Sequence, residues 1–370
     1  MIYLDNAATT SICDAAKKVI LDNMDEFYNP NSSYEAAHKI KVKVEEAREK
    51  IAELIGAEPE EIYFTSGGSE ANSWVTCNGF TLVSSIEHAS VKPDYIFDVD
   101  SNGLVDCENF KLRIYELLNN DYDYFCIHPS IISCMLVNNE IGVIEPIQEM
   151  AKIAHENDML FHVDAVQALP HMKISVKELG IDMLSGSSHK FGGVKGCGFL
   201  YVKNGIEIHP LINGGSQERG IRGGTTNVLG ILAMAAALED TTNQMDENNA
   251  KITYLSDKLK GNMLNIKGVT LNGSTDKNTH LDSILNFRVE GVRGADVVAM
   301  ADEFGIAISA GSACHEGDAH PSHVLKAIGL TDEEALSSIR ISIGRNNTEA
   351  EIDYTCEILP KIIERLRLFN

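Results

Sequence analysis

Residues 181–193 decide the fold, and they read Ile-Asp-Met-Leu-Ser-Gly-Ser-Ser-His-Lys-Phe-Gly-Gly. Their apolar start predicts a buried strand, and the small and polar residues that follow predict that it ends before Lys190. A lysine directly after a buried strand costs free energy unless its amine is paired or takes part in chemistry. Most lysines lie on the surface, so this segment alone favours a surface lysine. Whether Lys190 belongs to a site depends on the other strands.

The composition indicates a globular enzyme. The 370 residues are 44% hydrophobic and 23% charged, and this length predicts one large domain with a smaller one. The formal net charge is −23, whereas surfaces that bind nucleic acid or anionic lipid carry a basic stripe. No apolar run is long enough to cross a bilayer. We therefore expect no direct nucleic-acid partner and no membrane partner.

The N-terminus and the cysteines predict a cytoplasmic protein. Residues 1–6 have no basic segment followed by an apolar one, so they do not resemble a secretory signal. The eight cysteines are scattered and form no CxxC pair, which argues against a zinc framework and a thioredoxin-type motif. In a reducing cytoplasm most of them are expected to be free thiols. We predict no metal site.

Strands and helices alternate along the chain, which predicts an α/β fold. Residues 34–54 predict an amphipathic helix that ends at Gly56. The apolar runs of the strands are continuous, as in a mainly parallel sheet with both faces covered. Beyond the polar tract 240–249, a candidate domain boundary, the strands alternate more. There we expect an antiparallel sheet with helices on one face.

Six polar residues follow predicted strands, where functional groups gather in parallel sheets. They are Ser69, His88, Asn139, Asp164, Gln167 and Lys190. Residues 66–72 also combine a glycine turn with a helix start, whose free N–H groups and dipole form an anion site. A serine-capped helix without a ligand is the alternative. The glycine-rich loop 214–227 is either a flexible surface loop or a further anion contact.

These residues suit pyridoxal phosphate if Lys190 binds its aldehyde. The cofactor needs an anion site for its phosphate and a carboxylate at its ring nitrogen, so that the ring acts as an electron sink. It also needs a hydrogen-bond donor near the ring hydroxyl and a flat group against the ring. The suitable groups are the turn 66–69 with Ser187 and His189 for the phosphate, Asp164 for the nitrogen, Gln167 for the hydroxyl and His88 for the ring face.

Nine motifs in unbroken order resemble the cysteine desulfurases of the NifS/IscS type, within the class V aminotransferases. They are YLDNAATT (3–10), TSGGSEAN (65–72), EH (87–88), VNNEIG (137–142), HVDAVQ (162–167), SHK (188–190), RGGT (222–225), GSAC (311–314) and SIRISIGR (338–345). The resemblance implies the fold-type I architecture of pyridoxal-phosphate enzymes, with a seven-stranded, mainly parallel sheet in a large domain and a smaller α+β domain. We expect an N-terminal segment (1–14) that packs with the small domain, a large domain (15–245) and a small domain (246–370).

The resemblance also implies roles for the site residues and a homodimer. Lys190 would hold the cofactor and move the proton at the substrate Cα, while His88 would stack on the ring and transfer protons. Asp164 would pair with the ring nitrogen and Gln167 with the ring hydroxyl. The phosphate would be held by Gly68, Ser69, Ser187 and His189, with Thr225 from the second subunit. Asn139, at the cofactor, and Arg340 would hold the substrate carboxylate, because a guanidinium binds a carboxylate through two hydrogen bonds.

Cys314 separates a desulfurase from an aminotransferase. It begins a polar, glycine-containing loop, which is a setting for an exposed thiol, whereas Cys134 and Cys197 lie in apolar strand patterns and are expected in the core. The resemblance implies that the Cys314 thiolate attacks the sulfur of L-cysteine. L-alanine would leave, and a persulfide on Cys314 would pass to an acceptor protein.

Three features depart from the family pattern. Gly68-Ser69 replaces the usual Ala-Thr or Gly-Thr but keeps the hydroxyl, and residues 74–84 and 92–100 are short for the family. The loop after Cys314 carries three histidines where small hydroxyl residues are typical, namely His315, His320 and His323. This loop is either a solvated mobile segment or one in which a histidine tunes the pKa of the Cys314 thiol.

Several functions remain open from sequence. A selenocysteine lyase or another class V enzyme is the nearest alternative, although a transaminase has no use for Cys314. A partner-binding scaffold without catalytic activity is less favoured, because such a protein would be free to lose Lys190, Asp164, His88 and Cys314. The sulfur acceptor is open among iron–sulfur cluster assembly, tRNA thiolation and selenium metabolism.

Overall fold

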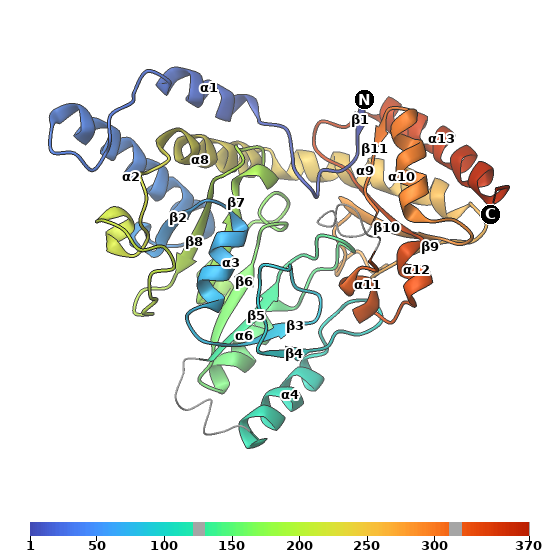
Figure 1. Cartoon of the computed structure of the whole chain (residues 1–370), viewed down its shortest axis with the longest axis horizontal. Helices are drawn as coiled ribbons and strands as arrows, with labels where there is room; N and C mark the ends of the chain where they lie inside the picture. The colour runs from blue at the N-terminus through green and yellow to red at the C-terminus, as the bar shows by residue number, and fades with distance from the viewer. Residues whose placement is uncertain (121–129, 311–319, 370) are drawn as a thin grey trace.

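The computed structural model describes residues 1–120, 130–310 and 320–369 (Figure 1). Its larger sheet has seven strands in the order β2-β8-β7-β6-β5-β3-β4. Neighbouring strands from β7 through β4 pair in parallel, and β8 pairs antiparallel with both β7 and β2. The prediction of a mainly parallel, seven-stranded α/β fold is therefore confirmed. The strands are β2 (Ile62–Thr65), β3 (Phe80–Ser84), β4 (Tyr95–Phe97), β5 (Ser130–Met135), β6 (Leu160–Asp164), β7 (Met183–Ser187) and β8 (Gly198–Val202).

Helices cover both faces of this sheet. They are α1 (Asp14–Asn23), α2 (Glu35–Ile55), α3 (Gly68–Thr76), α4 (Cys107–Asn120), α6 (Ile147–Glu156), α7 (Val176–Leu179) and α8 (Val228–Asn243), with short 3-10 turns at Pro59–Glu61, Ser188–Lys190 and Gln217–Gly220. On one face, α3 buries Ala71, Trp74 and Val75 against strand side chains. The other face packs against α2, α6 and α8 in the largest hydrophobic cluster. Because both faces are covered, the central strands are buried on both faces and mostly apolar, with buried polar residues such as Ser133, His162 and Ser185 among them.

The longest predicted helix matches α2 closely. Its buried side chains recur at intervals of three and four residues, which turns one stripe of the helix toward the core. Gly56 ends the helix with a φ of 71°, in the left-handed region that favours glycine. The prediction for residues 34–54 is confirmed. By contrast, α4 and β4 did not emerge from the sequence pattern.

The C-terminal part has its own sheet and core. A three-stranded antiparallel sheet has the order β12-β10-β9, and its hydrophobic cluster is separate from that of the larger sheet. The elements are α9 (Met245–Leu264), β9 (Val269–Leu271), β10 (Ile284–Val289), α10 (Gly294–Glu303), β11 (Ile306–Ala307), α11 (His323–Ala327), α12 (Asp332–Leu336), β12 (Ser338–Ser342) and α13 (Glu349–Arg367). The polar tract 240–249 is helical, because α8 ends at Asn243 and α9 begins at Met245. Its polarity reflects an exposed helix surface, and the proposed domain limits stay a prediction.

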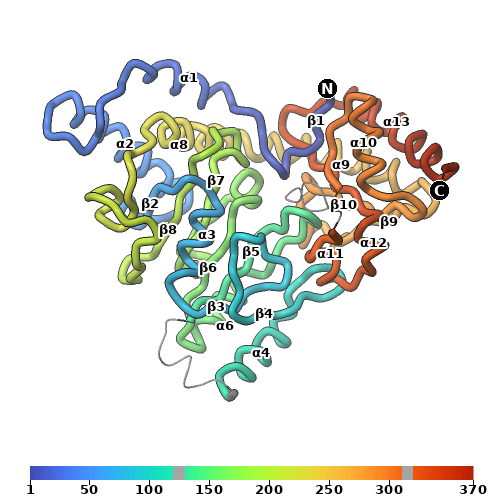
Figure 2. The backbone as a smooth tube through the Cα atoms, in the orientation of Figure 1, coloured from blue at the N-terminus to red at the C-terminus, as the bar shows by residue number. Residues whose placement is uncertain are grey.

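The N-terminal segment connects the two parts. Strand β1 (Ile2–Tyr3) pairs in parallel with β11, and the chain then runs along the larger sheet toward α1 (Figure 2). The Ala7 amide donates a hydrogen bond to Ser342 Oγ at 2.9 Å, and Thr10 donates to the His189 carbonyl. Residues 7–10 are therefore held between the two sheets. Among the described residues, no helix has the length and hydropathy that crossing a bilayer requires.

A buried carboxyl group behind the larger sheet makes the stability depend on pH. Glu145 is 3% exposed, and its Oε2 accepts a hydrogen bond from the Val105 amide at 2.9 Å. Its Oε1 is buried, and none of the residues that the structure describes donates a hydrogen bond to it. Burial raises the pKa of Glu145 from an ordinary value of 4.5 to about 8. The folded protein therefore binds a proton near pH 7 that the unfolded chain releases.

We predict that Glu145→Gln makes the free energy of unfolding less dependent on pH. The stabilising proton is fully present below pH 4.5 and is lost as the pH rises through about 8. For wild type this removes about 1.4 kcal/mol per pH unit within that window. Urea unfolding between pH 6.5 and 9 measures both slopes. The exposed Glu46→Gln variant serves as control and should follow wild type, and parallel curves for all three proteins would contradict the prediction.

Candidate functional site

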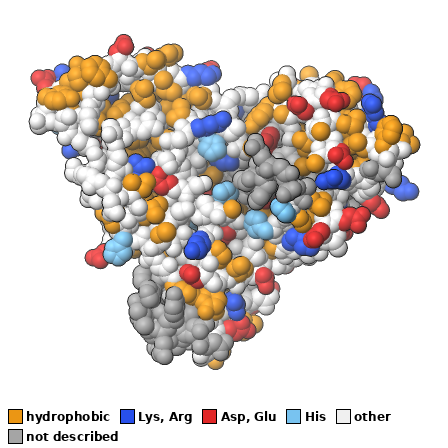
Figure 3. All heavy atoms as spheres, viewed as in Figure 1, with side chains coloured by type: hydrophobic (Ala, Val, Ile, Leu, Met, Phe, Trp, Pro, Cys, Tyr) orange, Lys and Arg blue, Asp and Glu red, His pale blue; other side chains and the backbone are white. Residues whose placement is uncertain are grey.

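Ten of the predicted site residues line one cavity of about 1150 Å³ between the two sheets. They are Gly68, Ser69, His88, Asn139, Asp164, Gln167, Ser187, His189, Lys190 and Arg340. Histidine side chains gather near the middle of the face shown in Figure 3. The structure thus brings together residues that lie as far apart in sequence as Gly68 and Arg340. What each does toward a cofactor or substrate stays a prediction.

Strand register explains why these side chains meet. Parallel pairing puts Met135 of β5 opposite Asp164 of β6, and Asp164 opposite Ser185 of β7. The carboxyl ends of the three strands therefore reach the same edge of the sheet. Ser187 closes β7 two residues later and is 3% exposed. The short 3-10 turn that follows ends at Lys190.

The predicted phosphate turn joins β2 to the N-terminus of α3. The first N–H groups of a helix have no intrahelical acceptor, so the start of α3 offers donors to an anion. A Cβ atom on Gly68 would lie 2.7 Å from Val166 Cγ2, so a larger residue does not fit here without movement. The Ser69 side chain is exposed toward the cavity. This geometry fits a phosphate group.

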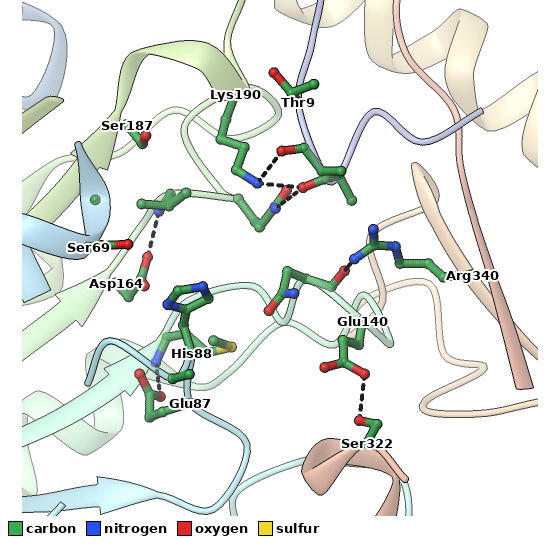
Figure 4. Close-up of a pocket in the computed structure, with 18 of the residues that line it drawn as sticks. Thr9, Ser69, Glu87, His88, Glu140, Asp164, Ser187, Lys190, Ser322 and Arg340 are labelled. Atoms are coloured by element: carbon green, nitrogen blue, oxygen red, sulfur yellow. Dashed lines mark hydrogen bonds between the residues drawn. The ribbon is translucent and has the colours of Figure 1, made fainter. Parts of the chain in front are cut away.

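Lys190 points across the cavity toward the N-terminal segment (Figure 4). Its Nζ donates hydrogen bonds to the Ala7 carbonyl at 2.6 Å and to the Ala8 carbonyl at 3.0 Å. The Gln167 amide also donates to the Ala7 carbonyl, at 2.8 Å. An ammonium group needs several acceptors when it is half-buried, and the backbone supplies them. The motif at residues 3–10 therefore helps to form the site, a role that the sequence did not reveal.

Asp164 and His88 are each held by hydrogen bonds. The two Asp164 oxygens accept from the Val166 amide at 2.9 Å and from Asn72 Nδ2 at 2.6 Å. His88 Nδ1 lies 2.7 Å from Ser90 Oγ and accepts from the Ser90 amide at 3.1 Å. Asn72 and Ser90 were not predicted as site residues. A signal for Asn72 was available, because it follows Gly68 by one helical turn within a quoted motif.

His189 is a neutral imidazole at physiological pH. Burial, followed by the charges of Lys190 and Lys195, lowers its pKa to about 4. Its Nδ1 lies 3.1 Å from the Thr9 hydroxyl. His189 can therefore contribute a hydrogen bond to an anion, but it does not contribute a positive charge.

Arg340 is 2% exposed and is held from two sides. Its Nη1 donates to the Asn139 carbonyl at 2.9 Å, and its Nη2 donates to Asp5 Oδ1 at 2.8 Å. Its Nε is buried and has no hydrogen-bond partner among the residues that the structure describes. A buried donor without an acceptor is costly, so a carboxylate that reached this guanidinium would be bound favourably. Here Asn139 positions Arg340 through its backbone.

Glu87 is a further cavity residue that the sequence left without a role. It is 4% exposed, and one carboxyl oxygen accepts a hydrogen bond from the Met135 amide, while no described residue pairs with the other. Burial, followed by repulsion from Asp164, raises its pKa well above the usual range. Its backbone carbonyl lies 2.9 Å from His323 Nε2. Glu87 is therefore a buried carboxyl group with a raised pKa in the wall of the cavity next to His88 (Figure 4).

Two predicted residues are not placed in the cavity. Thr225 lines a different, smaller pocket of this chain, together with Arg222. Cys314 and the neighbouring His315 lie outside the described residues, so the prediction for Cys314 stays a prediction. The residues nearest that segment on either side, Ala310 and His320, both line the large cavity.

The residues present fit pyridoxal phosphate. A lysine amine, a carboxylate, an imidazole and a helix N-terminus surround one cavity, and the glycine of the turn leaves room for close approach. Lys190 would hold the cofactor, and α3 would receive its phosphate. The helix N-terminus, the carboxylate and the imidazole meet three of the four requirements that the sequence had suggested, and Gln167, the predicted donor to the ring hydroxyl, lines the same cavity.

Known proteins resemble the whole chain. A family model described as aminotransferase class V matches residues 2–355. The cysteine desulfurase IscS of Clostridium botulinum is 39% identical over an alignment of 393 positions. The alignment covers 99% of this chain and 95% of that protein. The structure of a NifS-like protein from Rickettsia africae has a TM-score of 0.89 and 32% identity, with 98% of this chain and 99% of that one covered. SspA in complex with cysteine has a TM-score of 0.76 and 30% identity, with 94% and 100% covered. The chain therefore belongs to the aminotransferase class V family, and its cofactor is pyridoxal phosphate.

Proposed function

We propose that this protein is a cysteine desulfurase, which removes sulfur from L-cysteine and transfers it through a persulfide on Cys314. One observation carries the proposal: Lys190, Asp164 and Arg340 line the same cavity as the residues that flank the segment of Cys314. The relatives named cysteine desulfurase IscS support it, because they match nearly the whole chain. The complex of SspA with cysteine supports cysteine as the substrate.

Each residue has a task that its surroundings support. When bound, pyridoxal phosphate supplies an electron sink next to the substrate Cα. Arg340 would bind the substrate carboxylate, since within the described part of the chain its Nε has no acceptor. Lys190 would take the Cα proton, and the carbonyls of Ala7 and Ala8 would hold its amine while it waits. Asp164 would face the ring nitrogen with a carboxylate that two N–H groups orient.

Cys314 would perform the sulfur transfer. Its thiolate attacks the sulfur of the bound cysteine, a new sulfur–sulfur bond forms, and the carbon–sulfur bond breaks. The electron pair of the broken bond stays with the three-carbon fragment, which takes up protons and leaves as L-alanine. The persulfide then passes its outer sulfur to an acceptor. No redox partner is needed for the alanine-forming step.

We also propose a homodimer in which Thr225 serves the second subunit. Thr225 is exposed and lines no part of the cavity of its own chain. Its loop is anchored to α3, because Arg222 and Glu70 pair through two hydrogen bonds of 2.8 and 3.0 Å. Helix α1 lies at the same end of the molecule as this loop (Figure 1). Exposed apolar side chains of α1 and of the segment after it would be covered by a second copy; they include Leu21, Met24 and Phe27.

We also propose a protein as the sulfur acceptor and a cytoplasmic location. The IscS name of the relatives supports delivery of sulfur to a protein, with iron–sulfur cluster assembly, tRNA thiolation and selenium metabolism as candidate destinations. A cytoplasmic location is supported by the cysteines of the described residues, which are free thiols. Selenocysteine lyase is the alternative activity, and comparing cysteine with selenocysteine as substrate decides between them.

We predict that Cys314→Ala abolishes the formation of alanine and sulfide from cysteine with a reductant. The loss should be about 100-fold or more, because the nucleophile is removed. The bound cofactor should keep its visible absorption, since Cys314 does not hold it. Cys77→Ala is the matched control, because Cys77 is an exposed free thiol elsewhere. Full activity of Cys314→Ala would refute the proposed function.

We predict that Arg340→Lys raises KM for cysteine by about tenfold or more, because an ammonium group does not reproduce bidentate binding of a carboxylate. Steady-state kinetics of alanine formation measure this. Arg293→Lys is the control, because Arg293 lines the same cavity but is exposed. Equal effects of the two substitutions would argue against Arg340 as the carboxylate ligand.

A further inference from the structure

We infer that Asn72 and Ser90 are positioning residues for the cofactor ring. A chain of hydrogen bonds runs from Asp164 through Asn72 and Ser90 to His88. It fixes the carboxylate that would face the ring nitrogen together with the imidazole that would face the ring. The inference rests on the proposed roles of Asp164 and His88, and neither Asn72 nor Ser90 touches the reacting atoms.

Asn72 is the central member of the chain. Its Nδ2 donates one hydrogen to Asp164 Oδ2 at 2.6 Å and the other to Ser90 Oγ at 3.0 Å, so both amide hydrogens are used. The residue is 1% exposed, and its Oδ1 is buried with no partner in the described ranges 1–120, 130–310 and 320–369. A buried amide that leaves its acceptor unpaired is held in place by its donors. Asn72 is therefore oriented by the two groups that it connects.

Ser90 passes this orientation to His88. Because Ser90 Oγ accepts from Asn72, its own hydrogen is available for His88 Nδ1 at 2.7 Å. The Ser90 backbone amide also donates to Nδ1, at 3.1 Å, and a backbone N–H can only donate a hydrogen bond. His88 Nδ1 must therefore carry a lone pair, and the ring proton resides on Nε2. A proton on Nδ1 would face that N–H group directly.

Helix geometry links the chain to the predicted phosphate site. Asn72 follows Gly68 by four residues on α3, so both lie on the same face of the helix. The N-terminus of α3 faces the phosphate position, and its next turn holds Asp164. The neighbouring Ala71, Trp74 and Val75 are fully buried and fix the helix against the sheet. One rigid element thus sets two contacts to the same ligand.

The chain explains why an amide is needed at position 72. An aspartate there would place a second carboxylate against Asp164, and like charges at that distance repel strongly. An apolar residue would leave Asp164 Oδ2 without its donor, and only the Val166 amide would then orient the carboxylate through Oδ1. The pairing with the ring nitrogen would weaken. At the same time Ser90 would lose the hydrogen bond from Asn72 that orients its hydroxyl toward the His88 imidazole.

We predict that the Asn72→Leu holoenzyme binds pyridoxal phosphate about tenfold more weakly than wild type. Its visible absorption should shift, because the ring nitrogen is paired less well. Equilibrium dialysis and absorption spectra measure both. Ser73→Ala is the matched control. Ser73 is the next residue of α3 and donates to the Ser90 carbonyl at 3.3 Å, but it is not part of the chain of hydrogen bonds from Asp164 to His88. Wild-type affinity and an unshifted spectrum for Asn72→Leu would overturn the inference.

Two variants of Ser90 test the hydrogen bond between Ser90 and His88 without disturbing the core. Ser90→Ala should lower kcat about tenfold while KM changes little, and Ser90→Thr should restore kcat because it keeps the hydroxyl. ¹⁵N NMR of histidine-labelled holoenzyme near pH 7 reads the tautomer, with the His88 signal assigned from the His88→Gln variant. A proton on Nε2 and none on Nδ1 is expected. A proton on Nδ1, or equal kcat for the alanine and threonine variants, would overturn the inference.

These measurements separate the inference from the proposed function. Cofactor affinity, the absorption spectrum and the His88 tautomer do not depend on which substrate the enzyme uses. An active Cys314→Ala enzyme would remove the desulfurase assignment while leaving those three results intact. If Asn72→Leu does not fold, the Ser90 variants and the NMR spectrum still decide.

Discussion

The parallel register of β5, β6 and β7 is the constraint on which the site depends. It brings the carboxyl ends of the three strands to one edge, with Asp164 on β6 and Ser187 at the end of β7. A shift of one residue would turn every side chain of a strand to the opposite face. These strands are buried on both faces, so an alternation of buried and exposed residues does not fix their register. The helices packed on either side oppose such a shift instead. The covering helices, α3 above all, therefore fix where the polar groups stand.

The N-terminal segment is the second element that assembles the site. It pairs with β11 at one end, and its carbonyls accept the amine of Lys190. Asp5 from the same segment pairs with Arg340 of the C-terminal sheet. Lys190 and Arg340 are half-buried and buried cations that would be costly without partners. Backbone carbonyls of the N-terminal segment accept hydrogen bonds from Lys190, and the Asp5 carboxylate pairs with Arg340. This arrangement holds both cations in position before any ligand arrives.

The sequence predicted much of this correctly because its signals were local or were ordered motifs. The amphipathic period of α2, the glycine at its end and the continuous apolar strands were sufficient for the α/β fold. They were insufficient where context decides: α4 and β4 were missed, and the polar composition of the tract 240–249 did not reveal that α8 and α9 run through it. Ten predicted site residues meet in one cavity, whereas Asn72 and Ser90 went unnoticed because an amide or hydroxyl carries no sign of its partner.

The sequence by itself determined the family, the likeness of the motifs to a desulfurase and the set of polar residues at strand ends, since these depend on residue type and order. The tertiary structure alone decided which groups touch: that Lys190 rests on the carbonyls of Ala7 and Ala8, and that Asn72 joins Asp164 to Ser90. It also decided that Thr225 lies away from the cavity of its own chain. The physical reason is that a hydrogen bond requires the donor–acceptor distance to be correct to within a few tenths of an ångström, and no local pattern encodes that distance for residues far apart in sequence.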